Sequence, residues 1–324
     1  MLEVYYSVEK TLYVIIAIIG VPVNLLSITI LSRVKCGLST CTIRYLVAMA
    51  TADLMVIITE VILHRINNHY FPVSFLNITP VCSARVVLSR IALDISVWFT
   101  VAFTFDRLVA LCCQKLKTKY CTVQTANSVL STAGILLCLR NVPFYFTLEP
   151  GELIDNVPWF LVVKPSYYTD PWWIGFDWFD TVLTPLNPFV VILILNGWTV
   201  SHILVASRVR KGLRGQCNGE NRSDPEMERR RRSVILLFAL SGNFILLWMT
   251  TVAQFLYYQI TGNGGEWNNS EYIFYKVGFL LSNLSCCTNT FIYVATQSKF
   301  RVQAQNAVKY PITSAFLLIF ETRS

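Results

Sequence analysis

A small set of charged side chains interrupts otherwise apolar stretches of this sequence. They are Asp53, Glu60, Arg90, Asp94, Asp106, Arg107 and Lys276. Inside a membrane each charge is unfavourable by about 2.5 to 3.5 kcal/mol, so those present are expected to pair, bind or switch something. Asp53 and Glu60 are seven residues apart and Arg90 and Asp94 are four apart, so each pair shares one helix face. The pattern predicts a polar lining inside a helical bundle.

The histidines and cysteines of the sequence do not have the spacing of a catalytic zinc site. The three histidines, His64, His69 and His202, form no zinc-binding pattern such as H-E-x-x-H. The neighbouring pairs Cys112-Cys113 and Cys286-Cys287 point in different directions on a helix, which suits packing better than metal binding. We therefore expect no enzyme activity.

Seven long apolar stretches must position these charges. The sequence of 324 residues is 54% hydrophobic and 14% charged, with a mean hydropathy of +0.51, and a membrane-spanning helix needs roughly 20 mostly apolar residues. The stretches cover residues 11–31, 43–63, 81–113, 122–146, 176–206, 233–258 and 272–295. They predict an all-α membrane protein, a seven-transmembrane helix bundle that forms a single domain over residues 1–324.

Lysine and arginine gather after the first, third and fifth stretches, and basic loops stay on the cytoplasmic side. This predicts a multi-pass plasma-membrane protein with an extracellular amino terminus, a cytoplasmic carboxyl terminus and a first stretch retained as a signal anchor. Residues 207–232 are expected to form a cytoplasmic loop, residues 298–308 an amphipathic helix on the bilayer surface, and residues 309–324 a cytoplasmic tail. Because the net charge of +8 is spread over separate loops, we expect no nucleic-acid partner.

Two further features concern individual loops. The arginine run from Arg229 to Arg232 either anchors the sixth stretch at an anionic leaflet or contacts a partner, and the sequence leaves both open. The sequons at Asn77 and Asn268 fall in loops placed outside, so both are predicted glycosylation sites.

Short motifs follow one another through the stretches. They are Gly20-Val21-Pro22-Val23-Asn24, Ala52-Asp53-Leu54, Phe105-Asp106-Arg107-Leu108, Phe244 with Trp248, Asn289-Thr290-Phe291-Ile292-Tyr293 and Phe300-Arg301. In this order they resemble the signatures of the rhodopsin-like (class A) G-protein-coupled receptors over nearly the whole chain. The resemblance implies a receptor through which an extracellular ligand activates a heterotrimeric G protein.

Three stretches resemble one orphan group of these receptors, named G-protein-coupled receptor 139-like. They are Val21-Pro22-Val23-Asn24-Leu25-Leu26, Cys36-Gly37-Leu38-Ser39-Thr40-Cys41 and Phe103-Thr104-Phe105-Asp106-Arg107. This resemblance implies a small aromatic ligand, with Trp and Phe among the candidates, or a short peptide, and coupling to the Gq class.

The resemblance also implies an activation switch made of Asp106, Arg107, Phe244, Trp248, Asn289 and Tyr293. Asp106 is expected to hold the Arg107 guanidinium at rest and to release it toward a G protein. An arginine that only reaches for the membrane surface remains the alternative. The four-residue spacing of Phe244 and Trp248 fits a rotamer switch, but a plain core would also show it.

Asp53, Ser96 and Asn289 resemble the sodium site of the family. A buried carboxylate must be neutralised, paired or coordinated, and sodium ligated by these oxygens would favour the inactive packing. The alternative is a protonated aspartate that only stiffens the core. No cofactor other than this allosteric sodium ion is predicted.

The predicted ligand pocket comprises Glu60, Arg90, Asp94, Trp248, Thr251, Gln254 and Asn283. A zwitterionic amino acid needs a cation and an anion partner, which Arg90 with Asp94 or Glu60 could supply. Alternatively, Arg90 pairs with Asp94 or Glu60 inside the bundle and touches no ligand.

The sequence departs from the family at several positions. Cys82 opens the third stretch, but residues 147–175 hold no cysteine, so we predict no disulfide for Cys82 and a loosely held second outer loop. Thr250 and Thr290 replace prolines, and Thr251 replaces the subgroup's basic pocket residue. These departures keep two other functions open: a silent or decoy receptor, and a seven-helix ligand-gated channel or transporter.

Overall fold

The structure, a computed structural model, describes residues 2–34, 36–214, 225–261, 268–307 and 309. Seven helices in this part of the chain are long and apolar enough to cross a membrane, which confirms the predicted seven-helix bundle. These spans are Tyr6–Arg33, Thr40–Tyr70, Thr79–Cys112, Val123–Thr147, Pro171–Ala206, Arg230–Tyr257 and Asn269–Thr296.

The described elements follow in chain order. They are α1 (Leu2–Arg33), α2 (Thr40–Val56), a π-helical segment (Ile57–Ile66), α3 (Asn67–Tyr70), a 3-10 turn (Phe75–Asn77), α4 (Thr79–Cys112), α5 (Gln114–Tyr120), α6 (Val123–Asn141), a 3-10 segment (Val142–Thr147), β1 (Leu148–Glu149), β2 (Glu152–Ile154), β3 (Val157–Trp159), β4 (Val162–Val163), α7 (Ser166–Thr169), α8 (Pro171–Thr181), a second π-helical segment (Val182–Leu186), α9 (Asn187–Arg214), α10 (Pro225–Thr261) and α11 (Asn269–Thr296). Residues 298–307 form the predicted short helix after the seventh span.

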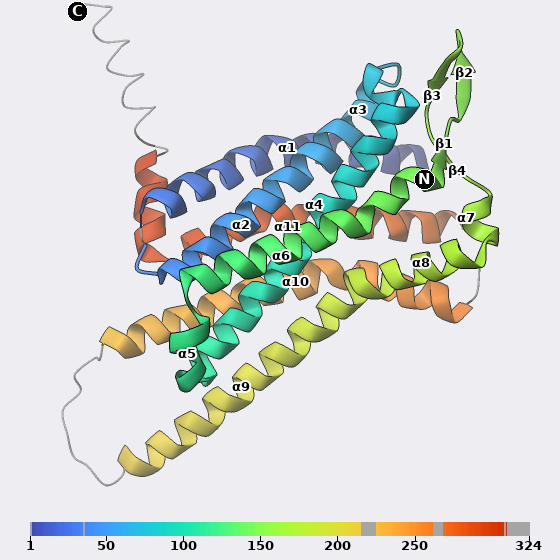
Figure 1. Cartoon of the computed structure of the whole chain (residues 1–324). Helices are drawn as coiled ribbons and strands as arrows, with labels where there is room; N and C mark the ends of the chain where they lie inside the picture. The colour runs from blue at the N-terminus through green and yellow to red at the C-terminus, as the bar shows by residue number, and fades with distance from the viewer. Residues whose placement is uncertain (1, 35, 215–224, 262–267, 308, 310–324) are drawn as a thin grey trace, which may run out of the picture.

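The bundle has two distinct ends (Figure 1). The small strands and α3 lie at one end, called here the hairpin end. Helix α5 and the helix of residues 298–307 lie at the other, called here the α5 end.

Local chemistry sets where several helices begin. The Ser39 hydroxyl accepts the Thr42 N–H at 3.2 Å and caps α2. Asn268 and Glu271 form a reciprocal capping box at the start of α11. Each such cap stabilises a helix by roughly 1 kcal/mol.

Side chains divide between a packed interior and an apolar surface. At the α5 end the core includes Tyr45, Phe103 and Leu240, all at most 1% exposed. Ile18 and Leu246 are 67% exposed, which suits contact with lipid tails rather than water. Toward the hairpin end, buried polar and charged groups interrupt this core.

The second outer loop differs from the sequence expectation. It forms two small antiparallel pairs, β1 with β4 and β2 with β3. The Phe160 N–H donates to the Asn77 carbonyl at 2.8 Å, and the Thr79 hydroxyl donates to the Phe160 carbonyl at 2.9 Å. The expectation of a loosely held loop was therefore wrong, because hydrogen bonds attach it beside Cys82, where a disulfide was expected in the family.

An arginine organises the residues beneath this attachment. Arg85 is 4% exposed, and its guanidinium donates to the Leu63 carbonyl at 2.7 Å, to Asn77 Oδ1 at 3.2 Å and to the buried free thiol of Cys82 at 2.9 Å. We call Asn77, Thr79, Arg85 and Phe160 the loop anchor.

Candidate functional site

A network of ion pairs crosses the bundle near the hairpin end. Arg140 of α6 pairs with Asp94 of α4 at 3.1 Å and also with Asp180 of α8. Arg90 of α4 pairs with the second oxygen of Asp180. Asn141 donates to Asp94 at 2.6 Å. Two cations and two anions therefore hold the third, fourth and fifth spans together.

The side chain of Arg90 is the accessible member of this network. It is 38% exposed, against 10% or less for its three ionic neighbours. Its guanidinium carbon also lies 3.6 Å from the centre of the Phe144 ring, within cation–π range. A ligand anion could reach Arg90 without unfolding the network around it.

The alternative that Arg90 pairs with Asp94 or Glu60 was wrong, since the ionic partner of Arg90 is Asp180. The fourth span brings Arg140 to Asp94, while the fifth span brings Asp180 to Arg90. The sequence analysis did not single out Arg140 or Asp180. Both lie inside predicted spans, at 122–146 and 176–206, so the cost of a charge inside the membrane could have pointed to them as well. The spacing rule compared residues only within one helix and could not find partners on others.

Glu60 lies in a separate cluster within the first π-helical segment. Its carboxylate accepts from Arg65 at 2.7 Å, from Ser89 at 2.5 Å and contacts the His64 ring at 3.1 Å. A π-helix bonds residues five apart, and its wider turn gathers positions 60, 64 and 65 on one side. The partners of the Glu60 carboxylate therefore lie in its own span and in α4.

The other predicted pocket residues are packed between α10 and α11. Thr251 meets α11 at Gly278, where an added β-carbon would lie 3.1 Å from the Thr251 hydroxyl. Asn283 is 1% exposed and donates to the Phe279 carbonyl of its own helix at 2.9 Å. Gln254 is half-buried, one turn closer to the hairpin end than Thr251. The structure thus places the predicted pocket residues at the same end, but in separate groups.

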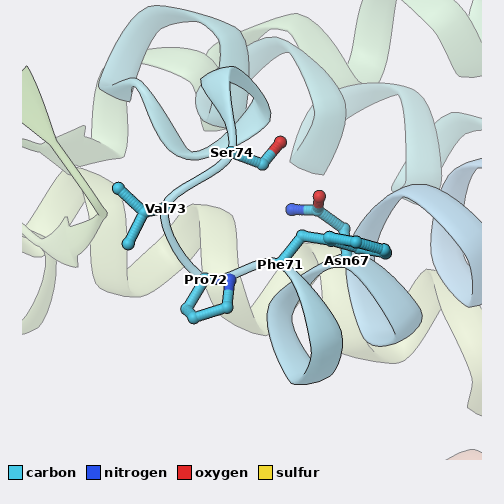
Figure 2. A pocket seen from close by; sticks show the side chains of 5 residues that line it. All are labelled: Asn67, Phe71, Pro72, Val73 and Ser74. Carbon is cyan, nitrogen blue, oxygen red and sulfur yellow. The ribbon is translucent and has the colours of Figure 1, made fainter.

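An open hollow of about 510 Å³ lies elsewhere, between α3 and the 3-10 turn (Figure 2). Its lining residues are Asn67, Phe71, Pro72, Val73 and Ser74. The Asn67 amide already donates to Asn77 at 3.3 Å, and the other side chains include no charge. Specific binding needs convergent polar groups, so this hollow is a poorer candidate for a ligand site than the ion-pair network.

Below the ion-pair network lies the aromatic pair of the predicted switch. The rings of Phe244 and Trp248 stack with centres 5.4 Å apart and planes inclined by 25°. The Trp248 indole donates to the Ser285 hydroxyl at 3.2 Å. A turn of this indole would break a contact between α10 and α11.

Asp53 lies deeper, at 1% exposure. Its two oxygens accept from Ser96 at 2.5 Å and from Asn289 at 2.8 Å, so the structure brings the three predicted sodium-site residues together. A cavity of about 10 Å³ adjoins them, with Trp248 and Ser285 also in its wall. This is room for about one water molecule or a small ion, and the carboxylate and hydroxyl oxygens are ligands that a hard cation accepts.

Arg107 is held inside the α5 end of the bundle. Its guanidinium pairs with Asp106 and donates to the Ser233 hydroxyl of α10 at 3.4 Å. The Cys41 thiol donates to Asp106 at 3.3 Å. In the adjoining loop, burial and the nearby Asp106 raise the pKa of the Cys121 thiol to about 11, so this thiol stays protonated at neutral pH.

The helix after the seventh span completes this end. Tyr293 is 1% exposed, and its ring packs edge-on against Phe300 with centres 5.7 Å apart. The Arg230 guanidinium of α10 donates to the Leu111 carbonyl of α4 at 2.8 Å. These contacts close the α5 end around Arg107.

The two predicted glycosylation sites differ in access. The Asn77 side chain is 4% exposed, and its amide nitrogen donates to the Pro72 carbonyl at 2.8 Å. A glycan on that nitrogen would replace its hydrogen bond to the Pro72 carbonyl and disturb the loop anchor. Asn268 is exposed and caps α11 through its oxygen, which leaves its nitrogen available.

Comparison with known proteins agrees with this arrangement. The family model described as 7 transmembrane receptor (rhodopsin family) matches residues 23–293. The chain belongs to this family. It is therefore a multi-pass protein of the plasma membrane.

A curated relative is the FMRFamide receptor of Drosophila melanogaster. It is 24% identical over 304 residues, an alignment that covers 89% of this chain and 51% of the relative. The chain thus spans about half the length of this relative.

Proposed function

We propose that this chain is a G-protein-coupled receptor that binds an extracellular ligand at the hairpin end and activates a heterotrimeric G protein at the α5 end. The observation that carries the proposal is a series of polar contacts inside one bundle. These are separate contacts at successive depths: the accessible Arg90 pairs with Asp180, Trp248 and Asp53 line one small cavity, and the enclosed Arg107 pairs with Asp106. An extracellular amino terminus and a cytoplasmic carboxyl terminus belong to the same proposal, supported by the basic loops at the α5 end.

The ligand we propose is a short peptide. The relative from Drosophila melanogaster is named for a peptide, and the network at the hairpin end presents charges of both signs. An aromatic amino acid, implied by the resemblance to the receptor 139-like group, is the second candidate. Coupling to the Gq class rests on that same resemblance.

The functional test compares wild-type receptor and Arg90→Ala in cells, with calcium and cAMP as readouts. The compounds are FMRFamide, L-tryptophan and L-phenylalanine. Loss of a charge-assisted contact with Arg90 is expected to raise the half-maximal concentration of the active compound about tenfold or more. Lys164→Ala, which removes a cation of the second outer loop outside the network, is the matched control and should leave potency unchanged.

Three other outcomes would each contradict one part of the proposed function. Unchanged potency in Arg90→Ala would remove Arg90 from the ligand site. Binding without nucleotide exchange on any Gα subunit would indicate a silent receptor. A ligand-gated current without a G protein would indicate a channel or transporter.

A further inference from the structure

A second charged site lies between α1 and α11, apart from the ion-pair network. Glu9 of α1 has a side chain that is 0% exposed, and within the described residues neither of its oxygens has a hydrogen-bond donor. Its ionic partner is Lys276 of α11, whose ammonium lies 3.6 Å from Oε1. Hydrogen bonds between an ammonium and a carboxylate are normally about 2.7 to 2.9 Å, so this pair is incomplete.

The sequence of α1 explains why Glu9 faces inward. Glu9, Tyr13 and Ile16 recur at helical spacing and are each at most 5% exposed. One turn deeper than Glu9, the Tyr13 hydroxyl is buried, as is Asn283 Oδ1 of α11, and within the described residues neither atom makes a well-formed hydrogen bond. Within the part of the chain that the structure describes, the α1–α11 interface thus presents several buried acceptor atoms that lack donors, which is unusual in a folded protein.

The nearby cations differ in how firmly they are held. Arg65 lies 5.7 Å from the centre of the Tyr13 ring, but its Nε donates to Glu60 at 2.7 Å. Among the described residues Lys276 makes no such hydrogen bond, and its side chain is 16% exposed. Its ammonium is also 5.5 Å from the centre of the Tyr272 ring, which offers an alternative partner. Lys276 can therefore leave Glu9 without losing every favourable contact.

We propose that Glu9 is the binding site for a guanidinium group of the ligand, and that Lys276 occupies this site until the ligand displaces it. A planar guanidinium can donate to both carboxylate oxygens at once, which the single ammonium of Lys276 does not do. Tyr13 and Asn283 offer further acceptors one turn deeper. The proposal names the chemistry of the ligand and rests on the receptor function proposed above.

The test uses purified full-length receptor in detergent and follows thermal unfolding with L-argininamide as the probe. L-Citrulline amide, in which a neutral urea replaces the guanidinium, is the matched compound. Because a ligand that binds only the folded state raises Tm, saturating argininamide should raise the wild-type Tm by roughly 2–4 °C, whereas citrulline amide should not.

Three variants locate the effect. Glu9→Gln should abolish the shift, while Lys276→Gln removes the competing cation and should lower the half-maximal concentration about tenfold. Glu152→Gln, at an exposed carboxylate of the same end, should behave as wild type. If Glu9→Gln alone does not fold, the double variant Glu9→Gln/Lys276→Gln removes both charges together and should also lose the shift.

An equal shift in wild type and in the Glu9 variants would overturn the proposal, as would a wild-type receptor that argininamide does not stabilise. These measurements need no G protein and no peptide. A receptor that fails to signal but passes this test would leave the Glu9 site intact, and the reverse result would leave the signalling function intact.

Discussion

Asp53 illustrates what a single side chain contributes to this receptor. Its carboxylate is buried and accepts hydrogen bonds from the side chains of Ser96 and Asn289. A carboxylate has about four acceptor positions, so further donors or a cation are needed to offset its burial. The adjoining cavity of about 10 Å³ leaves room for one.

A sodium effect is therefore expected for the wild-type receptor. Replacing choline by sodium at constant ionic strength should weaken agonist binding about fivefold or more, because the ion favours the resting packing. Asp53→Asn should abolish this dependence, since an amide has no charge for the ion. Asp155→Asn, on the β2–β3 turn, is the control. A sodium effect that persisted in Asp53→Asn would place the ion elsewhere.

The partners of the charged residues in the ion-pair network lie on other helices. Arg90 and Asp94 were predicted to line the ligand pocket because a charge inside a membrane is energetically unfavourable. The structure places both in the ion-pair network. Their partners, Asp180 and Arg140, depend on how three spans pack. No distance along the sequence relates Arg90 to Asp180.

At the scale of elements, the loop anchor replaces a covalent link. Cys82 is a free, buried thiol, and the second outer loop is held by hydrogen bonds to Asn77 and Thr79. A hydrogen-bonded attachment of this kind does not depend on the redox state of the medium.

We expect Cys82→Ala to change stability by less than about 1.5 kcal/mol, and dithiothreitol to leave the Tm of the receptor unchanged. Arg85→Met should lower stability by about 3 kcal/mol or more, because it removes the guanidinium that donates to the buried Leu63 carbonyl and one of the two amide and guanidinium donors to Asn77 Oδ1. Thermal unfolding with and without reductant measures both effects. A large loss of stability on reduction would show that a disulfide exists after all.

In helix α11, hydrogen bonds of a threonine stand where the family resemblance implies a proline. Thr290, which stands where the family resemblance led us to expect proline, donates to the Val23 carbonyl at 3.0 Å and lies 2.8 Å from the Ser27 hydroxyl. A proline could make neither contact. The threonine therefore joins α11 to α1, the same pair of helices that contains Glu9 and Lys276.

At the scale of the whole molecule, N-linked glycosylation tests the proposed orientation in the membrane. With the hairpin end outside, Asn268 should carry an N-linked glycan, because its amide nitrogen is accessible. Asn268→Gln should remove the mobility shift that glycosidase treatment produces in wild type.

Asn77→Gln should leave that shift unchanged but reduce the amount of folded receptor at the cell surface, since the longer side chain disturbs the loop anchor. An epitope at the amino terminus should be accessible in intact cells, and one after residue 309 only in permeabilised cells. Accessibility of both epitopes in intact cells would contradict the proposed topology.

The sequence alone determined the class of the molecule. Seven apolar stretches require seven helices, because backbone polar groups in lipid must be satisfied within each segment. The order of Asp53, Asp106-Arg107, Phe244 with Trp248 and Asn289 along those stretches indicated the receptor family, which the family comparison confirmed.

Only the tertiary structure decided which buried charges meet. The pairing of Arg90 with Asp180, the isolation of Glu60 beside Arg65, and the incomplete contact of Glu9 with Lys276 all join different spans or depend on a local π-helical turn. The hydropathy pattern predicts which residues lie within a membrane span. Which neighbour it faces depends on helix rotation and packing, because electrostatic partners inside a membrane are selected by distance in space.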